Sequence, residues 1–462
     1  MANNARGRLP AAMTMVAGAC TLAAVPTARA APEPFFAIAG GNTYYDAFHG
    51  LSSGGSNGTP VVYFRIDSIE PAGSTLWRSD GSVDGTHPAV PKSYSGRVGH
   101  MLVPEAGGVY FLSADKASTF QVHWADGSAS ATSTLQLTHE SRGIATLTGL
   151  ISDRPAFVRR TPDGESLMRL VDLQGTLSTV LEVDARADDW AEWVLGPTGG
   201  LVMWQTRTSP GGYRVARFGW HGELPTPLPP PAPATSWIYP HAAGAGAGIF
   251  CLKAYTSQGA RLHCTDGTAA GTIRPVPPTL GSDVWIPDFV RFTAVGEHLM
   301  FITHALSGPY RPWTTDGTHA GTQALLDFGP STVDVCTDDD DGTIYFTGDD
   351  TAGAIALWRT DGTREGTHRI ASVPDRCGHR GVSRALDGRA YVAAGTTLLV
   401  TDGTESGTHP VVGAPPLQTS SQETGYRGIA AAGRWILFAA ADGAGTMLWR
   451  IDLDPVFSGG FD

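Results

Sequence analysis

The chain has little charge and few lysines for its length. Charged residues make up 16% of its 462 positions, below the average of about 25% for soluble domains. Lysine occurs only at Lys92, Lys116 and Lys253, and the formal net charge is −12. Because phosphate contacts need clustered lysine and arginine, we expect no nucleic-acid partner and no attachment to an anionic membrane surface.

Motifs for metal-dependent or thiol chemistry are also missing. The sequence contains no H-E-x-x-H helix motif and no C-x-x-C pair, so we predict no catalytic residue and no cofactor. One acidic run, 338–341, is a weak candidate for calcium. Its ligands would be Asp338, Asp339 and Asp341, because calcium prefers carboxylate oxygens. A solvated loop is the simpler interpretation of this run.

The N-terminus is typical of an export signal. A short basic region precedes an apolar stretch over 9–25, and Ala28-Arg29-Ala30 fits the small-x-small rule for cleavage before Ala31. We therefore divide the chain into a signal peptide, 1–30, and a mature domain, 31–462. No later stretch is apolar over a spanning length. We expect a secreted or cell-surface protein without a transmembrane segment.

Cysteine usage fits an exported protein. Cys20 lies in the signal region and is the lipidation site in the alternative interpretation, a lipoprotein. The other four cysteines are an even number, which indicates disulfides in an exported chain. Cys251 and Cys264 face each other across a predicted hairpin. We expect the pairs Cys251–Cys264 and, by elimination, Cys336–Cys377; four buried free thiols are the alternative.

A repeat of about 46 residues dominates the rest of the chain. Each clear copy has Asp-Gly followed by threonine or serine, then Gly-Thr five residues after the aspartate, often with tryptophan ahead of the aspartate. The motif residues are Trp77, Asp80, Gly81, Asp126, Asp266, Gly267, Trp313, Asp316, Gly317, Trp358, Asp361, Gly362, Asp402 and Gly403. Worn copies near 172 and 219, and a last copy at Asp452 without its glycine, bring the number of units to nine.

The repeat predicts an all-β fold. Short runs of β-branched and aromatic residues precede the motifs, as at 61–64 and 344–346, and no window shows helical periodicity. Four strands in about 46 residues are typical of a propeller blade. We therefore predict a single large β-propeller of eight or nine four-stranded blades. A strand from 33–41 could complete the last blade.

The motif has a structural explanation. An aspartate after a strand can accept a backbone N–H two residues on, and the glycine supplies a positive φ, so Asp-Gly predicts a turn. The threonine hydroxyl can satisfy another amide of the loop, and the tryptophan is expected to pack between adjacent blades. Coordination of calcium or sugar by each Asp-Gly-Thr is the alternative.

These residues resemble the ELWxxDGT repeat family of exported bacterial proteins, some of which carry hyalin-like labels. The nearest copy to the family pattern runs from Leu357 to Thr367, with Ala356 in place of the glutamate. The resemblance implies a β-propeller in a secreted or surface setting. It implies no established reaction.

We therefore expect an exported, non-catalytic binding or scaffold protein that is monomeric and takes a protein or glycan ligand. One alternative is a propeller glycoside hydrolase or lyase, which would place paired carboxylates or a tyrosine near the axis. The other is a structural matrix protein. A propeller fold does not decide between them, because this fold serves many functions.

Overall fold

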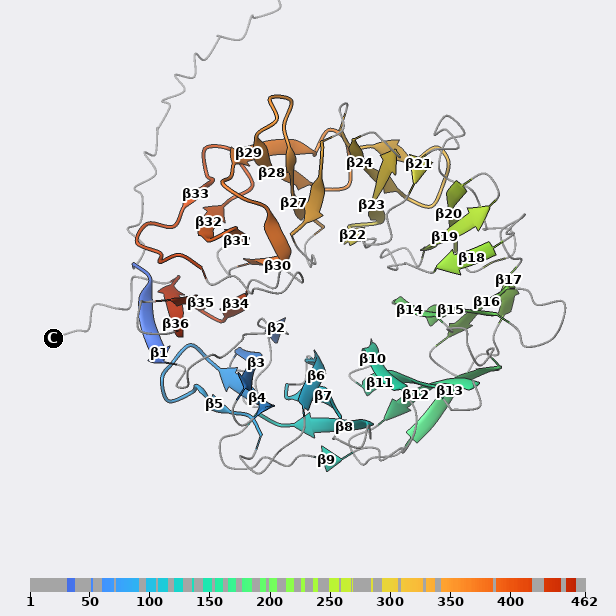
Figure 1. Ribbon diagram of the computed structural model, residues 1–462, viewed down its shortest axis with the longest axis horizontal. Coiled ribbons are helices and arrows are strands. Elements are labelled where there is room, and N and C mark those ends of the chain that lie inside the picture. Colours follow the sequence, from blue (N-terminus) through green and yellow to red (C-terminus); the bar gives the residue numbers. More distant parts are fainter. Residues whose placement is uncertain are drawn as a thin grey trace, which may run out of the picture.

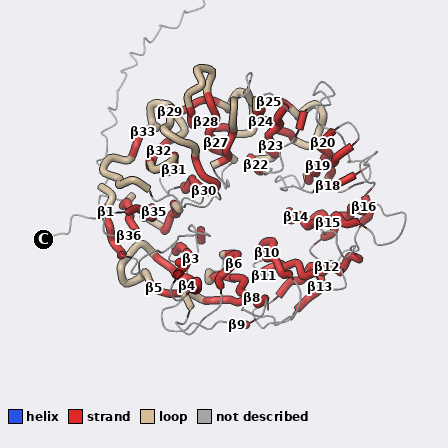
Figure 2. Tube along the Cα trace, viewed as in Figure 1, coloured by secondary structure: helices blue, strands red, loops and turns tan. Residues whose placement is uncertain are grey.

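The computed structural model is all-β: its described residues form strands and loops and no helix (Figure 2). They are residues 31–37, 51–52, 60–69, 72–90, 97–104, 107–114, 120–127, 135–136, 144–151, 154–160, 165–171, 177–184, 192–196, 199–205, 213–219, 226–228, 236–239, 249–256, 259–266, 268, 284–285, 293–305, 309–326, 330–336, 342–384, 388–417, 428–441 and 446–453. No helix long and apolar enough to cross a membrane occurs in these ranges. The predicted signal peptide, 1–30, lies outside them.

Within the described residues the strands form nine antiparallel sheets, which we number 1 to 9 along the chain. Figure 1 shows the sheets arranged one after another around a ring. Successive strands lie side by side in each sheet, so each sheet is a meander of local pairings. This arrangement follows from the repeat, because each unit supplies one sheet.

Sheets 1 to 3 have four strands each, in chain order. The strands of sheet 1 are β2 (Leu51–Ser52), β3 (Val61–Ile69), β4 (Ala72–Ser79) and β5 (His87–Pro88). The strands of sheet 2 are β6 (Arg97–Leu102), β7 (Val109–Ala114), β8 (Phe120–Ala125) and β9 (Leu135–Gln136). The strands of sheet 3 are β10 (Ile144–Ile151), β11 (Arg154–Arg160), β12 (Glu165–Val171) and β13 (Leu177–Asp184).

Sheets 4 to 6 differ in strand number among the described residues. Sheet 4 contains β14 (Glu192–Gly196), β15 (Gly199–Gln205), β16 (Tyr213–Gly219) and β17 (Thr226–Leu228). Sheet 5 contains β18 (Ser236–Tyr239), β19 (Phe250–Thr256) and β20 (Gly259–Thr265). Sheet 6 contains β21 (Val284–Trp285), β22 (Thr293–Val295), β23 (His298–Ala305), β24 (Tyr310–Thr315) and β25 (Gln323–Ala324). In sheet 6 both β21 and β22 pair with β23, so two short strands share the place of one.

Sheets 7 to 9 complete the ring. Sheet 7 contains β26 (Val333–Val335), β27 (Ile344–Asp349), β28 (Ile355–Thr360) and β29 (His368–Ser372). Sheet 8 contains β30 (Cys377–Arg384), β31 (Ala390–Ala394), β32 (Thr397–Thr401) and β33 (His409–Pro410). Sheet 9 contains β34 (Ile429–Ala432), β35 (Trp435–Ala441), β36 (Thr446–Asp452) and β1 (Glu33–Ala37).

The N-terminal strand belongs to the last sheet. Strand β1 pairs antiparallel with β36, with Glu33 opposite Arg450 and Ala37 opposite Met447. The expectation that a strand from 33–41 completes the last unit is therefore confirmed. The worn units are real as well, since β12 and β16 are the third strands of sheets 3 and 4.

The cores lie between neighbouring sheets. One cluster joins Tyr63 of sheet 1 to Met101 and Phe111 of sheet 2, and another joins Tyr391 of sheet 8 to Phe438 of sheet 9. All five side chains are at most 5% exposed. Since no sheet buries both its faces alone, each unit depends on its two neighbours for stability.

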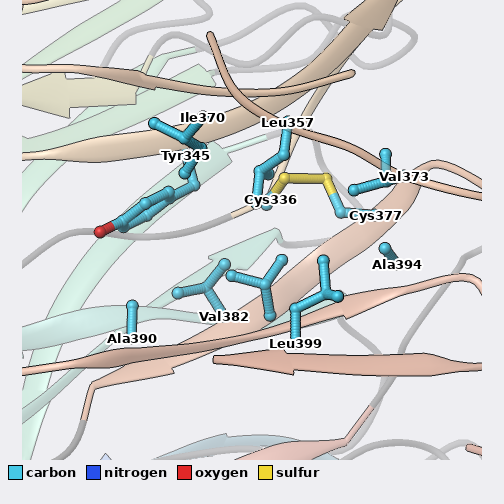
Figure 3. Close-up of a cluster of buried hydrophobic side chains, with 11 residues drawn as sticks. Cys336, Tyr345, Leu357, Ile370, Val373, Cys377, Val382, Ala390, Ala394 and Leu399 are labelled. Atoms are coloured by element: carbon cyan, nitrogen blue, oxygen red, sulfur yellow. A yellow bond between two sulfur atoms is a disulfide. The ribbon is translucent and has the colours of Figure 1, made fainter. Parts of the chain in front are cut away.

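Both expected disulfides are present. Cys251 and Cys264 are opposite each other on β19 and β20, so this bond staples a hairpin within sheet 5. Cys336 follows β26 and Cys377 begins β30, so the second bond joins sheet 7 to sheet 8 inside a buried cluster (Figure 3). An ion pair of 3.7 Å between Arg376 Nε and Asp334 Oδ2 links the same two sheets beside it.

Candidate functional site

The Asp-Gly-Thr loops join the third and fourth strands of the sheets. In the copy after β28, the backbone N–H and the hydroxyl of Thr363 both donate to Asp361 Oδ1, at 2.9 and 2.6 Å. The Gly366 N–H donates to the Thr363 hydroxyl oxygen at 2.9 Å. The hydroxyls of Thr360 and Thr367 bond each other at 2.7 Å and close the base of the loop. The predicted turn is therefore observed, with the hydroxyls enclosed in it.

The same network recurs in three further copies. It joins residues 79–86, 315–322 and 401–408 with the same donors and acceptors. In sheet 5, Thr268 donates twice to Asp266 Oδ1 in the same way, while Gly267 lies outside the described residues. Four independent copies with one geometry indicate that the motif sequence encodes the loop itself.

The second glycine of each motif is required by the aspartate. A methyl group added to Gly366 would lie 2.1 Å from the carboxylate oxygens of Asp361. The equivalent distance to the nearest carboxylate atom is 2.0 to 2.1 Å in the three other copies, at Gly85, Gly321 and Gly407. The carboxylate therefore lies directly on the glycine Cα, where no larger residue fits.

This contact predicts a non-additive pair of substitutions. Asp361→Ala removes two hydrogen bonds of a solvent-exposed loop and should lower the free energy of unfolding by about 1 kcal/mol. Gly366→Ala displaces the same carboxylate and should lower it by about 2 kcal/mol, through lost bonds and overpacking. The double variant should be no less stable than Gly366→Ala, because the clash partner is gone. Chemical denaturation of the four proteins measures this cycle, and simple additivity would contradict the contact.

The first glycine of the motif packs on the preceding sheet. Gly81 has a φ of +89°, and a methyl group there would lie 2.2 Å from Trp435 Cδ1 of sheet 9. A methyl group on Gly127 of sheet 2 would lie 2.1 Å from the hydroxyl of Tyr63 of sheet 1. Methyl groups on Gly317, Gly362 and Gly403 would lie 2.8 to 3.0 Å from Ile249, Val295 and Arg359 of the preceding sheets. Each motif loop is thus also a joint between two sheets.

An arginine two residues before the aspartate strengthens this joint, and sequence reasoning missed its role. Arg78 Nη1 of sheet 1 donates to the Gly127 carbonyl of sheet 2 at 2.6 Å. Arg450 Nη1 of sheet 9 donates to the Gly81 carbonyl of sheet 1 at 2.6 Å. In the worn copy that has Gly219 in place of the aspartate, Arg217 Nη1 donates to the Asp266 carbonyl of sheet 5 at 3.1 Å. The recurrence of Leu-Trp-Arg in the motif is the signal that could have revealed it.

The motif tryptophans lie between sheets, as expected. Trp358 belongs to a buried cluster with Met300 of sheet 6 and Phe346 of sheet 7, and Trp313 lies in a cluster shared by sheets 5 and 6. Each tryptophan also stacks on a phenylalanine directly opposite it in its own sheet, such as Phe346 at 6.1 Å. The ring fills the core while its N–H is bonded: Trp358 Nε1 donates to the Gly348 carbonyl at 3.2 Å.

The last copy uses its aspartate differently. Asp452 has no glycine after it, and its carboxylate accepts hydrogen bonds from Arg434, including Nε to Oδ1 at 2.9 Å. Asp452 is 7% exposed, so its carboxylate is largely shielded from water, while the Arg434 side chain is 39% exposed. The worn motif therefore keeps a structural role through a different partner.

The hydrogen bonds lower the pKa of three motif aspartates. The Thr268 and Thr404 side chains, followed by their backbone N–H groups, lower the pKa of Asp266 and Asp402. For Asp361, partial burial raises the pKa, but the two bonds from Thr363 and weaker contributions outweigh it. In each case the carboxylate, and not the carboxylic acid, is the form the loop binds.

A pH dependence follows. A lowered pKa in the folded state means that the stabilisation is complete above the unfolded pKa of about 4 and is lost as pH falls through the folded value. Resistance to urea should therefore decline below about pH 4. The triple variant Asp266→Asn, Asp361→Asn, Asp402→Asn should decline less, because asparagine accepts the same bonds without titrating. An identical decline in both proteins would contradict the assignment.

The part of the chain that the structure describes contains no candidate metal site. Those residues contain no group of three or more histidine, cysteine, aspartate or glutamate side chains placed to hold an ion. The calcium candidates Asp338, Asp339 and Asp341 lie outside the described residues.

The motif copy at Asp126 keeps its turn glycine. Asp126 follows β8, and the next residue, Gly127, has a φ of 76°, a positive value like those of the other motif glycines.

No protein-family model and no curated protein matches the chain. Among solved structures it is similar to a puromycin hydrolase, with 13% identity and a TM-score of 0.40 over 80% of this chain and 61% of the other. It is also similar to oligogalacturonate lyase from Vibrio parahaemolyticus, with 9% identity and a TM-score of 0.41 over 86% and 99%. TolB from Acinetobacter baumannii gives 11% identity and a TM-score of 0.32 over 68% and 77%. These values are too low to bear on the activity of this chain.

Proposed function

We propose that the chain is a single nine-bladed β-propeller of the ELWxxDGT repeat kind. Support comes from the nine antiparallel sheets found among the described residues, their sequential order around a ring, and the pairing of β1 with β36. The repeated joints between neighbouring sheets at the motif loops agree with a blade-by-blade construction. Nine blades, rather than eight with a shared unit, fit this topology.

We infer that the protein acts as an exported, non-catalytic binding or scaffold protein for a protein or glycan ligand. The observation that carries this proposal is the complete use of the motif chemistry within the fold. In the four full copies, the aspartate, both glycines and the hydroxyls build the loop and its joint to the preceding sheet. The most repeated polar residues therefore form a rigid frame and not a set of reactive groups.

The proposed setting is secreted or cell-surface, after cleavage before Ala31. The two disulfides are compatible with an extracellular protein. The inter-sheet bond Cys336–Cys377 suits a ring that must keep its shape outside the cell. A rigid ring with variable connecting loops is well suited to presenting a binding surface.

The test is binding of the mature protein, 31–462, to a broad glycan array and to surface extracts, with calcium and with chelator. We expect saturable binding to one glycan class or one protein, without conversion of the ligand. The matched variant Asp338→Asn, Asp339→Asn, Asp341→Asn separates calcium bound at 338–341 from calcium bound elsewhere. Turnover of an arrayed glycan, seen as new reducing or unsaturated ends, would overturn the proposal.

A further inference from the structure

Strand β1 is held by a specific pair of aromatic side chains. Phe36 lies 5.5 Å from the Trp77 ring of sheet 1, measured between ring centroids, in a cluster with Phe64 and Leu448. Phe35 packs against a second cluster that joins sheets 1 and 9. The two phenylalanines therefore lie in the seam between the first and last sheets. Strand β1 thus pairs with β36 and also contributes side chains to the contact between the two sheets.

Arg450 adds a polar anchor to the same strand. Its Nε and Nη2 atoms lie 2.7 and 2.6 Å from Glu33 Oε1 of β1. Its Nη1 donates to the Gly81 carbonyl of sheet 1. The guanidinium also lies over the rings of Phe35 and Trp435, at 5.3 and 4.3 Å. The Arg450 side chain thus contacts both Glu33 and Phe35 of β1 and also sheet 1.

Among the described residues, no disulfide crosses the seam between sheets 1 and 9. The two disulfides lie in sheet 5 and between sheets 7 and 8. Strand β1 is only five residues long, contains Pro34, and has an irregular register between Pro34 and Phe36. Its attachment therefore depends on side-chain contacts more than on a long ladder of hydrogen bonds, which makes release and replacement possible.

The chain between β1 and β2 is long enough for exchange. Residues 38–50 number thirteen, which can span at most about 45 Å when extended. Strand β1 can therefore move away from its own seam while it stays attached to β2. At the same seam of a second copy it would make identical contacts.

We propose that the β36 edge, with its two phenylalanine sites and Arg450, accepts β1 from a second copy of this chain. Exchange of an identical element changes few contacts, so the free-energy difference between the closed form, with β1 on its own ring, and the exchanged form is small. At low protein concentration the chain's own β1 occupies the β36 edge, because its effective concentration there is of the order of millimolar. The protein is then a monomer in dilute solution and links to its neighbours where copies are crowded.

The test traps β1 of one mature chain, 31–462, on β36 of another. One chain carries Ala37→Cys and the other carries Met447→Cys, since these two positions are opposite each other. After mixing and mild oxidation, we expect a covalent heterodimer whose linked peptides contain positions 37 and 447. Its yield should rise with protein concentration and exceed by about tenfold the yield of Ala37→Cys with exposed Glu405→Cys.

Two controls keep the outcome decisive. The double variant Ala37→Cys, Met447→Cys in one chain should cross-link within a monomer, and failure to do so would disprove the β1–β36 pairing and the proposal with it. Phe36→Asp added to the Ala37→Cys chain should abolish the heterodimer. A 37–447 yield equal to the 37–405 yield at all concentrations would overturn the proposal.

Discussion

Replacing Cys336 and Cys377 together by alanine is expected to lower the free energy of unfolding by about 4 kcal/mol. The bond joins residues 41 positions apart, and closing a loop of that length removes about this much chain entropy from the unfolded state. The bond also holds sheet 7 to sheet 8 within a buried cluster. The midpoint of urea unfolding measures the loss.

The matched control is Cys251→Ala with Cys264→Ala. This pair closes a separation of only 13 residues within one hairpin, so the expected loss is about 3 kcal/mol. Amide exchange should distinguish the two variants further. The first should lose protection in both sheets 7 and 8, and the second mainly in sheet 5. Unchanged stability in the first variant would contradict the role assigned to the inter-sheet bond.

Gly81→Ala is expected to lower the free energy of unfolding by about 3 kcal/mol. Part of this, about 1 to 2 kcal/mol, is the cost of an L-residue at a positive φ. The rest arises because the new methyl group would meet the Trp435 indole of sheet 9, and overpacking of this kind costs about 1 to 3 kcal/mol. The Trp435 ring lies 4.3 Å from the Arg450 guanidinium, which donates to the Gly81 carbonyl, so a shift of the ring would also disturb this bond.

Gly353→Ala is the matched control for Gly81→Ala. Gly353 has a similar φ of +80°, but a methyl group there would have nothing within 4 Å. Its substitution should therefore show only the backbone cost, about 1 kcal/mol. The difference between the two variants isolates the contact between sheets. Equal losses would mean that the motif glycine is required for the turn and contributes nothing to the joint.

Much of this architecture could be predicted from sequence because its determinants are local. The spacing of the aspartates predicts nine units, including the worn ones near 172 and 219, and the sheets of the described residues follow them. Hairpin symmetry alone places Cys251 opposite Cys264, as observed. These features depend on residues within one unit, where the number of intervening residues fixes the geometry.

The contacts between units could not be predicted in this way. Arg78 and Gly127 are 49 residues apart and Arg450 and Gly81 are 369 apart, so their pairing depends on how the ring twists and closes. The close approach of the aspartate carboxylate to the second glycine, as at Gly366, also could not be predicted from the sequence, because it depends on the three-dimensional path of the loop. The predicted calcium ligands Asp338, Asp339 and Asp341 lie outside the described ranges, so this site stays a prediction.

Amide hydrogen exchange of Gly81→Ala shows whether the repeated motif joins neighbouring sheets. If it does, protection is lost on both sides of the seam, in β4 of sheet 1 and in β35 and β36 of sheet 9. Gly353→Ala, measured in parallel, should change protection only around its own turn. If the loss in the Gly81→Ala protein is confined to residues 79–86, the motif is a turn only and does not join the sheets.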